Sequence, residues 1–237
     1  VVLFSSFGIS SASEDANTDT RANVGSKFYF NETFNIDPAW NADDVSVVVF
    51  VQSISKVRKN MNNDPGRQYD SYEAIQSTID FLDTSTKDTG AQKRVLGECF
   101  TATWCGYCPG SVGAHDRLVS DPDYFPDHYT LIEWHAASSA HGFGNADATA
   151  RFNFYNWGGA IPFTTFDGVV GHIGGSTNPN QTSIDTTYKG YINGRSGNPS
   201  PVGIKTFGKK AGANSWINAT IEVESIPPDE LYKVNFV

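Results

Sequence analysis

Apolar and polar residues alternate at both ends of this chain, and the alternation predicts β-strands there. The pattern is clearest around Phe28, Phe30 and Phe34, which are separated by even intervals. A stretch over 10–24 is rich in Ser, Asp and Asn and is typical of a loop. The predicted strands of the two ends are 1–9, 28–36, 45–54, 202–207, 216–223 and 231–237.

The middle of the chain has a different pattern, in which apolar runs of strand length alternate with segments of helical spacing. Tyr69, Tyr72 and Ile79 have the helical spacing, which predicts a helix over 69–82. Strands that alternate with helices indicate an α/β arrangement. The other predicted helices are 111–119, 147–157 and 184–192, and the predicted strands are 95–102, 129–135 and 163–166.

Neither end of the chain has enough strands for a stable sandwich of its own. Pooled, the two ends supply about six strands, which suffice for a small antiparallel β-sandwich that both ends build together. We therefore predict an α+β protein in which an α/β domain, residues 66–197, is inserted between residues 1–65 and 198–237 of the sandwich. A length of 237 residues suits one or two domains with an ample core.

Charge and hydropathy argue against several classes of partner. The formal net charge is −9, which argues against binding to nucleic acid or to an anionic membrane surface. No run of about eighteen apolar residues occurs, so we predict no membrane span. Residues 1–9 lack a basic region and are too short for an intact signal peptide, so a strand is the better interpretation.

Residues 103–109, Thr-Trp-Cys-Gly-Tyr-Cys-Pro, indicate a chemistry more clearly than any other part of the chain. Two residues separate Cys105 from Cys108, and Pro109 is typical of the first turn of a helix. Because a strand pattern precedes the pair and a helix pattern follows it, the cysteines fall on a strand-to-helix turn. There the Cys105 thiolate would face unpaired N–H groups and the positive end of the helix dipole, which lower the pKa of a thiol. The motif therefore predicts a thiol–disulfide redox centre.

Two other interpretations of the cysteine pair stay open. The pair could be half of a zinc site, with Cys99 and His115 as further ligands, although structural zinc usually takes four such ligands and no second pair is present. It could also be a closed, structural disulfide without turnover. Cys99 is typical of a buried core thiol, and we interpret His115 as a surface histidine. We predict no metal and no cofactor, and we assign no buried acidic proton acceptor.

A second motif lies further along the chain, where Gly158-Gly159-Ala160 leads into Ile161-Pro162 and a strand closed by Asp167-Gly168. Together the two motifs resemble the thioredoxin superfamily over roughly residues 92–195. The resemblance implies a cis proline that packs against the active-site disulfide, and a preceding residue whose backbone pairs with an extended substrate. Gly-Tyr between the cysteines, in place of Gly-Pro, implies a more oxidising couple than that of thioredoxin. The implied catalytic residues are Cys105, Cys108 and Pro162, and the implied substrate-binding residues are Trp104, Tyr107 and Ile161.

A closer resemblance is to the Omp28-type family of secreted thioredoxin-like proteins, in which a β-sandwich domain follows the thioredoxin-like domain. It is carried by the run 100–109, by Glu133-Trp134-His135 and by Ile161-Pro162. The closing part of the family's sandwich resembles residues 32–52 of this chain. Because these residues lie before the thioredoxin-like region here and not after it, the order of the sandwich looks rotated. Natural permutation, one frame of a tandem repeat, or donation of strand 1–9 to the next molecule would each explain this order. The remaining possibility is that both ends pair within one chain.

Three sequons for N-glycosylation, at Asn31, Asn180 and Asn218, favour an extracellular or cell-surface protein. We therefore expect a secreted or cell-surface thioredoxin-like thiol–disulfide oxidoreductase or isomerase, whose partners are proteins with disulfides or dithiols. The alternative is a structural subunit of a cell-surface or extracellular fibre. Such a subunit would bind copies of itself by strand donation through residues 1–9, and its disulfide would be purely structural.

Overall fold

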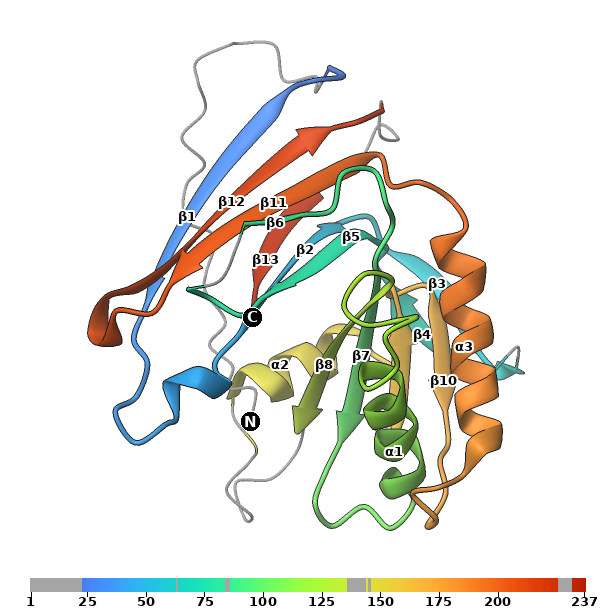
Figure 1. Ribbon diagram of the computed structural model, residues 1–237. Helices are drawn as coiled ribbons and strands as arrows, with labels where there is room; N and C mark the ends of the chain where they lie inside the picture. The colour runs from blue at the N-terminus through green and yellow to red at the C-terminus, as the bar shows by residue number, and fades with distance from the viewer. Residues whose placement is uncertain (1–22, 63, 84–85, 136–143, 145, 226–231) are drawn as a thin grey trace.

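The computed structural model describes residues 23–62, 64–83, 86–135, 144, 146–225 and 232–237. They form a mixed α+β fold built mostly of antiparallel strands (Figure 1), which confirms the predicted α+β class. The strand predicted over 1–9 lies outside the described residues, so strand donation by this segment stays a prediction. No helix in the described ranges is long and apolar enough to cross a membrane.

Strands from both ends of the chain build one four-stranded antiparallel sheet, called the outer sheet here. In order across it they are β1 (Lys27–Phe34), β12 (Ser215–Val223), β11 (Val202–Lys209) and β6 (Lys87–Asp88). The register of β1 and β12 places Asn31 opposite Asn218. Two short 3-10 helices accompany this sheet, η1 (Ala42–Asp44) after β1 and η3 (Gly212–Asn214) between β11 and β12.

The two ends meet again in a three-stranded antiparallel sheet, the middle sheet. Its strands in order are β13 (Tyr232–Phe236), β2 (Val47–Ser53) and β5 (Ala74–Asp80). The described end strands therefore pair within one chain, β1 with β12 and β13 with β2. β5 and β6, which lie inside residues 66–197, also pair with strands of the chain ends.

The helix predicted over 69–82 is wrong. This segment contains the end of β4 (Asp64–Ser71), which pairs with β3 (Val57–Met61) in a two-stranded hairpin, and the whole of β5. Its apolar residues are spaced three and four apart, as in a helix. Every residue of β5 is buried, however, so its apolar side chains need not alternate with polar ones. Ile75 and Ile79 pack into different hydrophobic clusters, and this burial on both sides overrides the local periodicity.

The cysteine motif belongs to a third sheet, which we call the redox sheet after the redox centre predicted from the sequence. In it β7 and β8 run parallel and the other neighbours antiparallel. Its strands in order are β10 (Val170–Ile173), β9 (Phe163–Phe166), β7 (Val95–Thr101) and β8 (Tyr129–His135). The associated helices are α1 (Cys108–Val119), α2 (Ala146–Phe154) and α3 (Thr182–Ser196). The strands β7, β8 and β9 and the three helices confirm the predictions made for the same stretches of sequence, whereas β10 was not predicted.

Three hydrophobic clusters among the described residues join the layers. Val47, Val49 and Val51 of β2 pack with residues of the outer sheet, whereas Val48 and Phe50 pack with residues of the redox sheet. The third cluster lies between the redox sheet and the helices α1 and α3. The middle sheet is thus covered on both faces, which explains why β2 is apolar at five successive positions.

Candidate redox site

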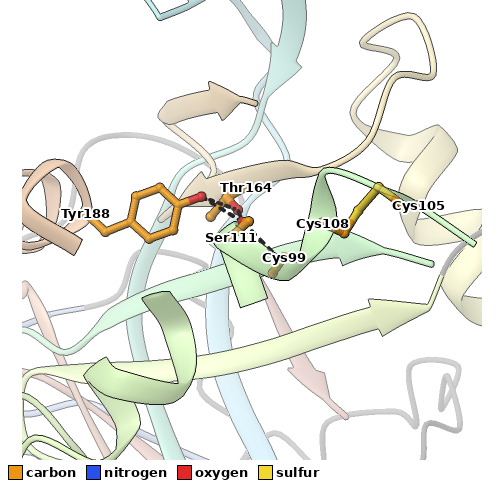
Figure 2. Close-up of a disulfide and its surroundings, with 6 residues drawn as sticks. All are labelled: Cys99, Cys105, Cys108, Ser111, Thr164 and Tyr188. Carbon is orange, nitrogen blue, oxygen red and sulfur yellow. Dashed lines mark hydrogen bonds between the residues drawn. A yellow bond between two sulfur atoms is a disulfide. The ribbon is translucent and has the colours of Figure 1, made fainter. Parts of the chain in front are cut away.

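Cys105 and Cys108 form a disulfide between the end of β7 and the start of α1 (Figure 2). Their Cα atoms are 5.4 Å apart. The Cys105 N–H donates to the carbonyl oxygen of Ala102 at 3.0 Å, and the Cys108 N–H donates to that of Cys105 at 3.3 Å. α1 begins at Cys108. The predicted strand-to-helix turn is therefore confirmed.

The two cysteines differ in their access to solvent. Cys108 is only 2% exposed, whereas Cys105 is partly exposed. Trp104 and Tyr107, next to them in the chain, are 56% and 65% exposed. Cys105 is therefore the more accessible of the two cysteines to an external thiol, and Cys108 is shielded.

The start of α1 presents a positive end that no acidic side chain of its own first turn compensates. Tyr107, the residue before the helix, makes no side-chain cap, and the first turn contains no acidic residue. Pro109 occupies the first turn, where its missing N–H costs no helical hydrogen bond. The partial positive charge of the helix N-terminus would therefore stabilise a thiolate at the adjacent cysteines once the disulfide is reduced.

The loop after β10 brings the two sequence motifs together at Gly175. The Ile161–Pro162 peptide bond is cis and Pro162 is buried. A Cβ added at Gly175 would lie 2.1 Å from the carbonyl oxygen of Tyr107 and 2.8 Å from Cγ of Pro162. The Gly174 N–H donates to the carbonyl oxygen of Pro162 at 3.1 Å. No local pattern indicates this role, because a Gly-Gly pair after a strand is typical of any turn.

The same loop also packs closely on α1. The Gly110 N–H donates to the carbonyl oxygen of Ser176 at 2.8 Å, and a Cβ at Gly110 would lie 2.7 Å from Cβ of Ser176. A Cβ at Gly113 would lie 2.2 Å from the carbonyl oxygen of Pro179. Because these two glycines are three residues apart, they lie on one face of the helix. Helix and loop therefore meet backbone to backbone, which fixes the position of the helix start.

A buried network of hydrogen bonds lies beneath α1 (Figure 2). Ser111 Oγ is 3.7 Å from the sulfur of Cys99 and 2.8 Å from the hydroxyl of Tyr188. Thr164 Oγ1 lies 3.4 Å from Ser111 Oγ and 3.3 Å from the Tyr188 hydroxyl. Burial raises the pKa of the Cys99 thiol to about 12. Cys99 is thus a neutral thiol in the core, as predicted.

His115 belongs to the same network, so its interpretation as a surface histidine is wrong. It is fully buried, with Nδ1 2.7 Å from the hydroxyl of Tyr129 and Nε2 3.3 Å from Thr164 Oγ1. Burial, with a smaller contribution from His172, lowers the pKa of His115 to about 3. The sequence could not show this, because the face of α1 that carries His115 is covered by segments distant in the chain.

Glu133 is an ionisable residue that sequence reasoning did not select. It lies on β8 directly opposite Cys99, so both side chains share the face of the redox sheet that α1 covers. Burial, and to a lesser extent the charge of Asp116, raises the pKa of Glu133 to about 7. Its Oε1 has no hydrogen-bond partner among the described residues. A carboxyl group that can change its charge near neutral pH therefore lies on this face.

The segment that leads into Pro162 has its backbone open to solvent. Residues 158–160 are exposed, and Gly158 and Gly159 have φ values of +92° and +88°. Within the described part of the chain, no backbone group of residues 158–161 bonds to another backbone group. Ile161 is partly exposed. These N–H and C=O groups are available to pair with an extended polypeptide.

The three predicted glycosylation sites lie away from the disulfide in the chain and all are exposed. Asn31 and Asn218 face each other across β1 and β12, and Asn31 Nδ2 donates to Asn218 Oδ1 at 2.5 Å. Asn180 lies just before α3. Within the described ranges, no group of three or more His, Cys, Asp or Glu side chains is placed to hold a metal ion.

Comparison with known proteins identifies no relative of this chain. A scan against models of protein families, a search of curated proteins and a search of solved structures all found no match.

Proposed function

We propose that this chain is a thiol–disulfide oxidoreductase of the thioredoxin superfamily. The observation that carries the proposal is the asymmetric disulfide: Cys105 is partly exposed, and Cys108 is buried at the start of a helix without acidic residues in its first turn. The cis Ile161–Pro162 bond supports it, because Gly175 contacts both Pro162 and the cysteine turn.

In the oxidising direction, a substrate thiolate attacks Sγ of Cys105. The bond between Cys105 and Cys108 breaks, Cys108 leaves as a thiolate, and a mixed disulfide joins Cys105 to the substrate. A second substrate thiolate then attacks the substrate sulfur of the mixed disulfide and releases Cys105 as a thiolate. The substrate dithiol loses two electrons and becomes a disulfide, while the protein's disulfide is reduced to a dithiol that takes up two protons.

In the reducing or isomerising direction, the Cys105 thiolate attacks a substrate disulfide and one substrate sulfur leaves as a thiolate. Cys108 then attacks Sγ of Cys105, which restores the protein's disulfide and releases the second substrate thiolate. The start of α1 favours each thiolate form of the protein's cysteines. The relative burial of the two cysteines supports attack on the substrate by Cys105 and resolution by Cys108.

The substrate in this proposal is an extended polypeptide segment around a reactive cysteine. The unpaired backbone of residues 158–161 supplies hydrogen bonds to it, and Ile161 is the residue that pairs with the substrate next to the disulfide. Trp104 and Tyr107 supply exposed aromatic surface beside Cys105. This mode of binding needs only main-chain pairing and a few side-chain contacts, so it is compatible with many protein substrates.

For the architecture, we propose a thioredoxin-like domain joined to an antiparallel β-sandwich, as in the Omp28-type family but with a rotated order. The cluster between the outer and middle sheets supports the sandwich, and by their pairing β5 and β6 belong to it. The exposed sequons at Asn31, Asn180 and Asn218 support an extracellular or cell-surface location.

A structural subunit of a surface fibre is the second candidate, because the low exposure of Cys108 also suits a disulfide that is never reduced. The described end strands already have partners within the chain, so strand donation would depend on residues 1–9.

The reduction potential of the Cys105–Cys108 pair, titrated with glutathione, separates the two candidates. We expect a value between roughly −120 and −230 mV, the range of exchange enzymes. A pair that stays oxidised below roughly −300 mV, on particles much larger than a monomer, would instead indicate a structural disulfide.

Trapping of a mixed disulfide tests the assignment of roles. The variant Cys108→Ser cannot resolve and should accumulate a covalent adduct between Cys105 and a disulfide-containing protein such as oxidised ribonuclease. The matched variant Cys105→Ser leaves only the buried Cys108 and should accumulate little adduct. Equal trapping by both variants would contradict the assigned roles.

A further inference from the structure

The hairpin of β3 and β4 is a basic element in an acidic protein. Residues 56–67 contain Lys56, Arg58, Lys59 and Arg67 but only one acidic residue, Asp64, whereas the whole chain has a net charge of −9. All four basic side chains belong to exposed residues. We call residues 56–67 the basic hairpin.

The basic hairpin is attached to the edge of the redox sheet next to the candidate site. Figure 1 places β3 beside β10. The Asn62 N–H donates to the carbonyl oxygen of Gly171 at 3.1 Å, its Nδ2 donates to that of Ile173 at 2.8 Å, and the Ile173 N–H donates to Asn62 Oδ1 at 3.1 Å. The chain then continues from Ile173 into the loop of Gly175, which contacts Pro162 and Tyr107.

A cavity of about 500 Å³ lies between the basic hairpin and the segment that leads into the cis proline. Its lining includes Arg58, Gly66 and Arg67 from the basic hairpin, and Trp157, Gly158 and Ala160 from that segment. Ala160 immediately precedes Ile161, the residue proposed to pair with the substrate backbone. A polypeptide bound along residues 158–161 would therefore present its side chains to this cavity.

The charges of the cavity are only partly neutralised. Asp70 accepts from Arg58 Nη1 at 2.7 Å and also lies 3.6 Å from Lys56. Arg67 meets Asp64 at 3.7 Å, and both side chains are more than half exposed, so this pair is weak. Arg67 can therefore pair with an acidic group brought by a ligand. Lys59 is exposed on the same hairpin but outside this lining, and it adds positive potential.

We propose that this cavity binds acidic side chains that flank the reactive cysteine of the substrate polypeptide. The inference rests on the proposed redox function and adds a class of substrate to it. An Asp or Glu carboxylate accepts the planar guanidinium fork of Arg67, while Arg58 contributes positive potential from a fixed position. Complementary charge of this kind accelerates encounter and sets specificity, and salt weakens it.

The experiment uses two cystine peptides of identical length, one flanked by three aspartates and the other by three lysines. The reduced protein is mixed with each peptide, and its rate of oxidation is followed at 20 mM and 300 mM NaCl. In a parallel assay, the oxidised protein is mixed with dithiothreitol, a neutral dithiol, and the rate at which it oxidises this dithiol is measured. We expect the acidic peptide to react about fivefold faster than the basic one at low salt, with much of the difference lost at high salt.

The double variant Lys59→Gln/Arg67→Gln should lose this preference while it oxidises dithiothreitol at the wild-type rate. Lys209→Gln, which removes one charge from the exposed end of β11 on the outer sheet, is the control and should keep the preference. Equal rates for the two peptides in the wild-type protein would overturn the inference and leave the redox function standing.

Failure of the proposed function has a different signature, in which neither the peptides nor dithiothreitol exchange with the protein. Binding is therefore also measured without chemistry, by calorimetry with the same peptides carrying serine in place of cysteine. Tighter binding of the acidic peptide, weakened by Lys59→Gln/Arg67→Gln, would support the cavity as an acidic subsite. Equal binding of the two peptides would overturn it.

Discussion

Gly175 offers the sharpest test of how the site is held together. The substitution Gly175→Ala adds one methyl group where the backbone of the cysteine turn and the ring of Pro162 converge. The new Cβ would lie 2.1 Å from the carbonyl oxygen of Tyr107 and 2.8 Å from Cγ of Pro162. Neither neighbour can move independently, because Tyr107 leads into α1 and Pro162 leads into β9.

The size of the effect follows from the cost of overpacking. Forcing an extra methyl group into a closely packed site shifts the backbone and typically costs about 1 to 3 kcal/mol. We expect a loss in this range in the free energy of unfolding of the oxidised protein. The shift also moves Tyr107 relative to Pro162, so exchange with a substrate peptide should slow more than exchange with dithiothreitol, which needs no backbone pairing.

Urea denaturation of the oxidised protein measures the stability, and Gly190→Ala is the matched control. Gly190 lies within α3 and has nothing within 4 Å of an added Cβ, so alanine there should stabilise the protein by up to about 1 kcal/mol. If Gly175→Ala were as stable as the wild type and exchanged peptides normally, the close approach of the two motifs would be refuted.

Two further predictions concern buried ionisable groups. Because the pKa of Glu133 rises from an ordinary 4.5 to about 7 in the folded protein, the stability that its protonated form contributes is present below pH 4.5 and is lost as the pH rises through 7. The unfolding free energy of the wild type should therefore fall between pH 4.5 and pH 8, and Glu133→Gln should reduce this fall by about 3 kcal/mol. Urea denaturation at the two pH values measures it, and an equal fall in the variant and the wild type would contradict the prediction. Arg151 pairs with the fully buried Glu98 at 2.6 Å. Arg151→Leu leaves an uncompensated carboxylate and should lower the free energy of unfolding by about 3 to 5 kcal/mol. The double variant Glu98→Leu/Arg151→Leu should recover part of this stability in the same urea assay.

Local sequence patterns determined the elements that hold the disulfide. The apolar run of β7, the cysteine spacing and Pro109 together specify a strand, a tight turn and a helix start, and each signal acts within a few residues of the chain. The same holds for β8 and α3, whose boundaries agree with the predicted ones to within a few residues. The burial of Cys99 followed from its place in an apolar strand.

Only the tertiary structure decided which residues surround the disulfide. The strand nature of β5, the burial of His115 and the raised pKa of Glu133 all depend on segments that are far away in sequence but cover these residues in the fold. The contact of Gly175 with Tyr107 and Pro162 likewise joins three separate stretches of chain. Periodicity reports which face of an element is apolar, but burial on both faces, desolvation of a charge and close backbone approach are properties of the packed layers, and no local pattern encodes them.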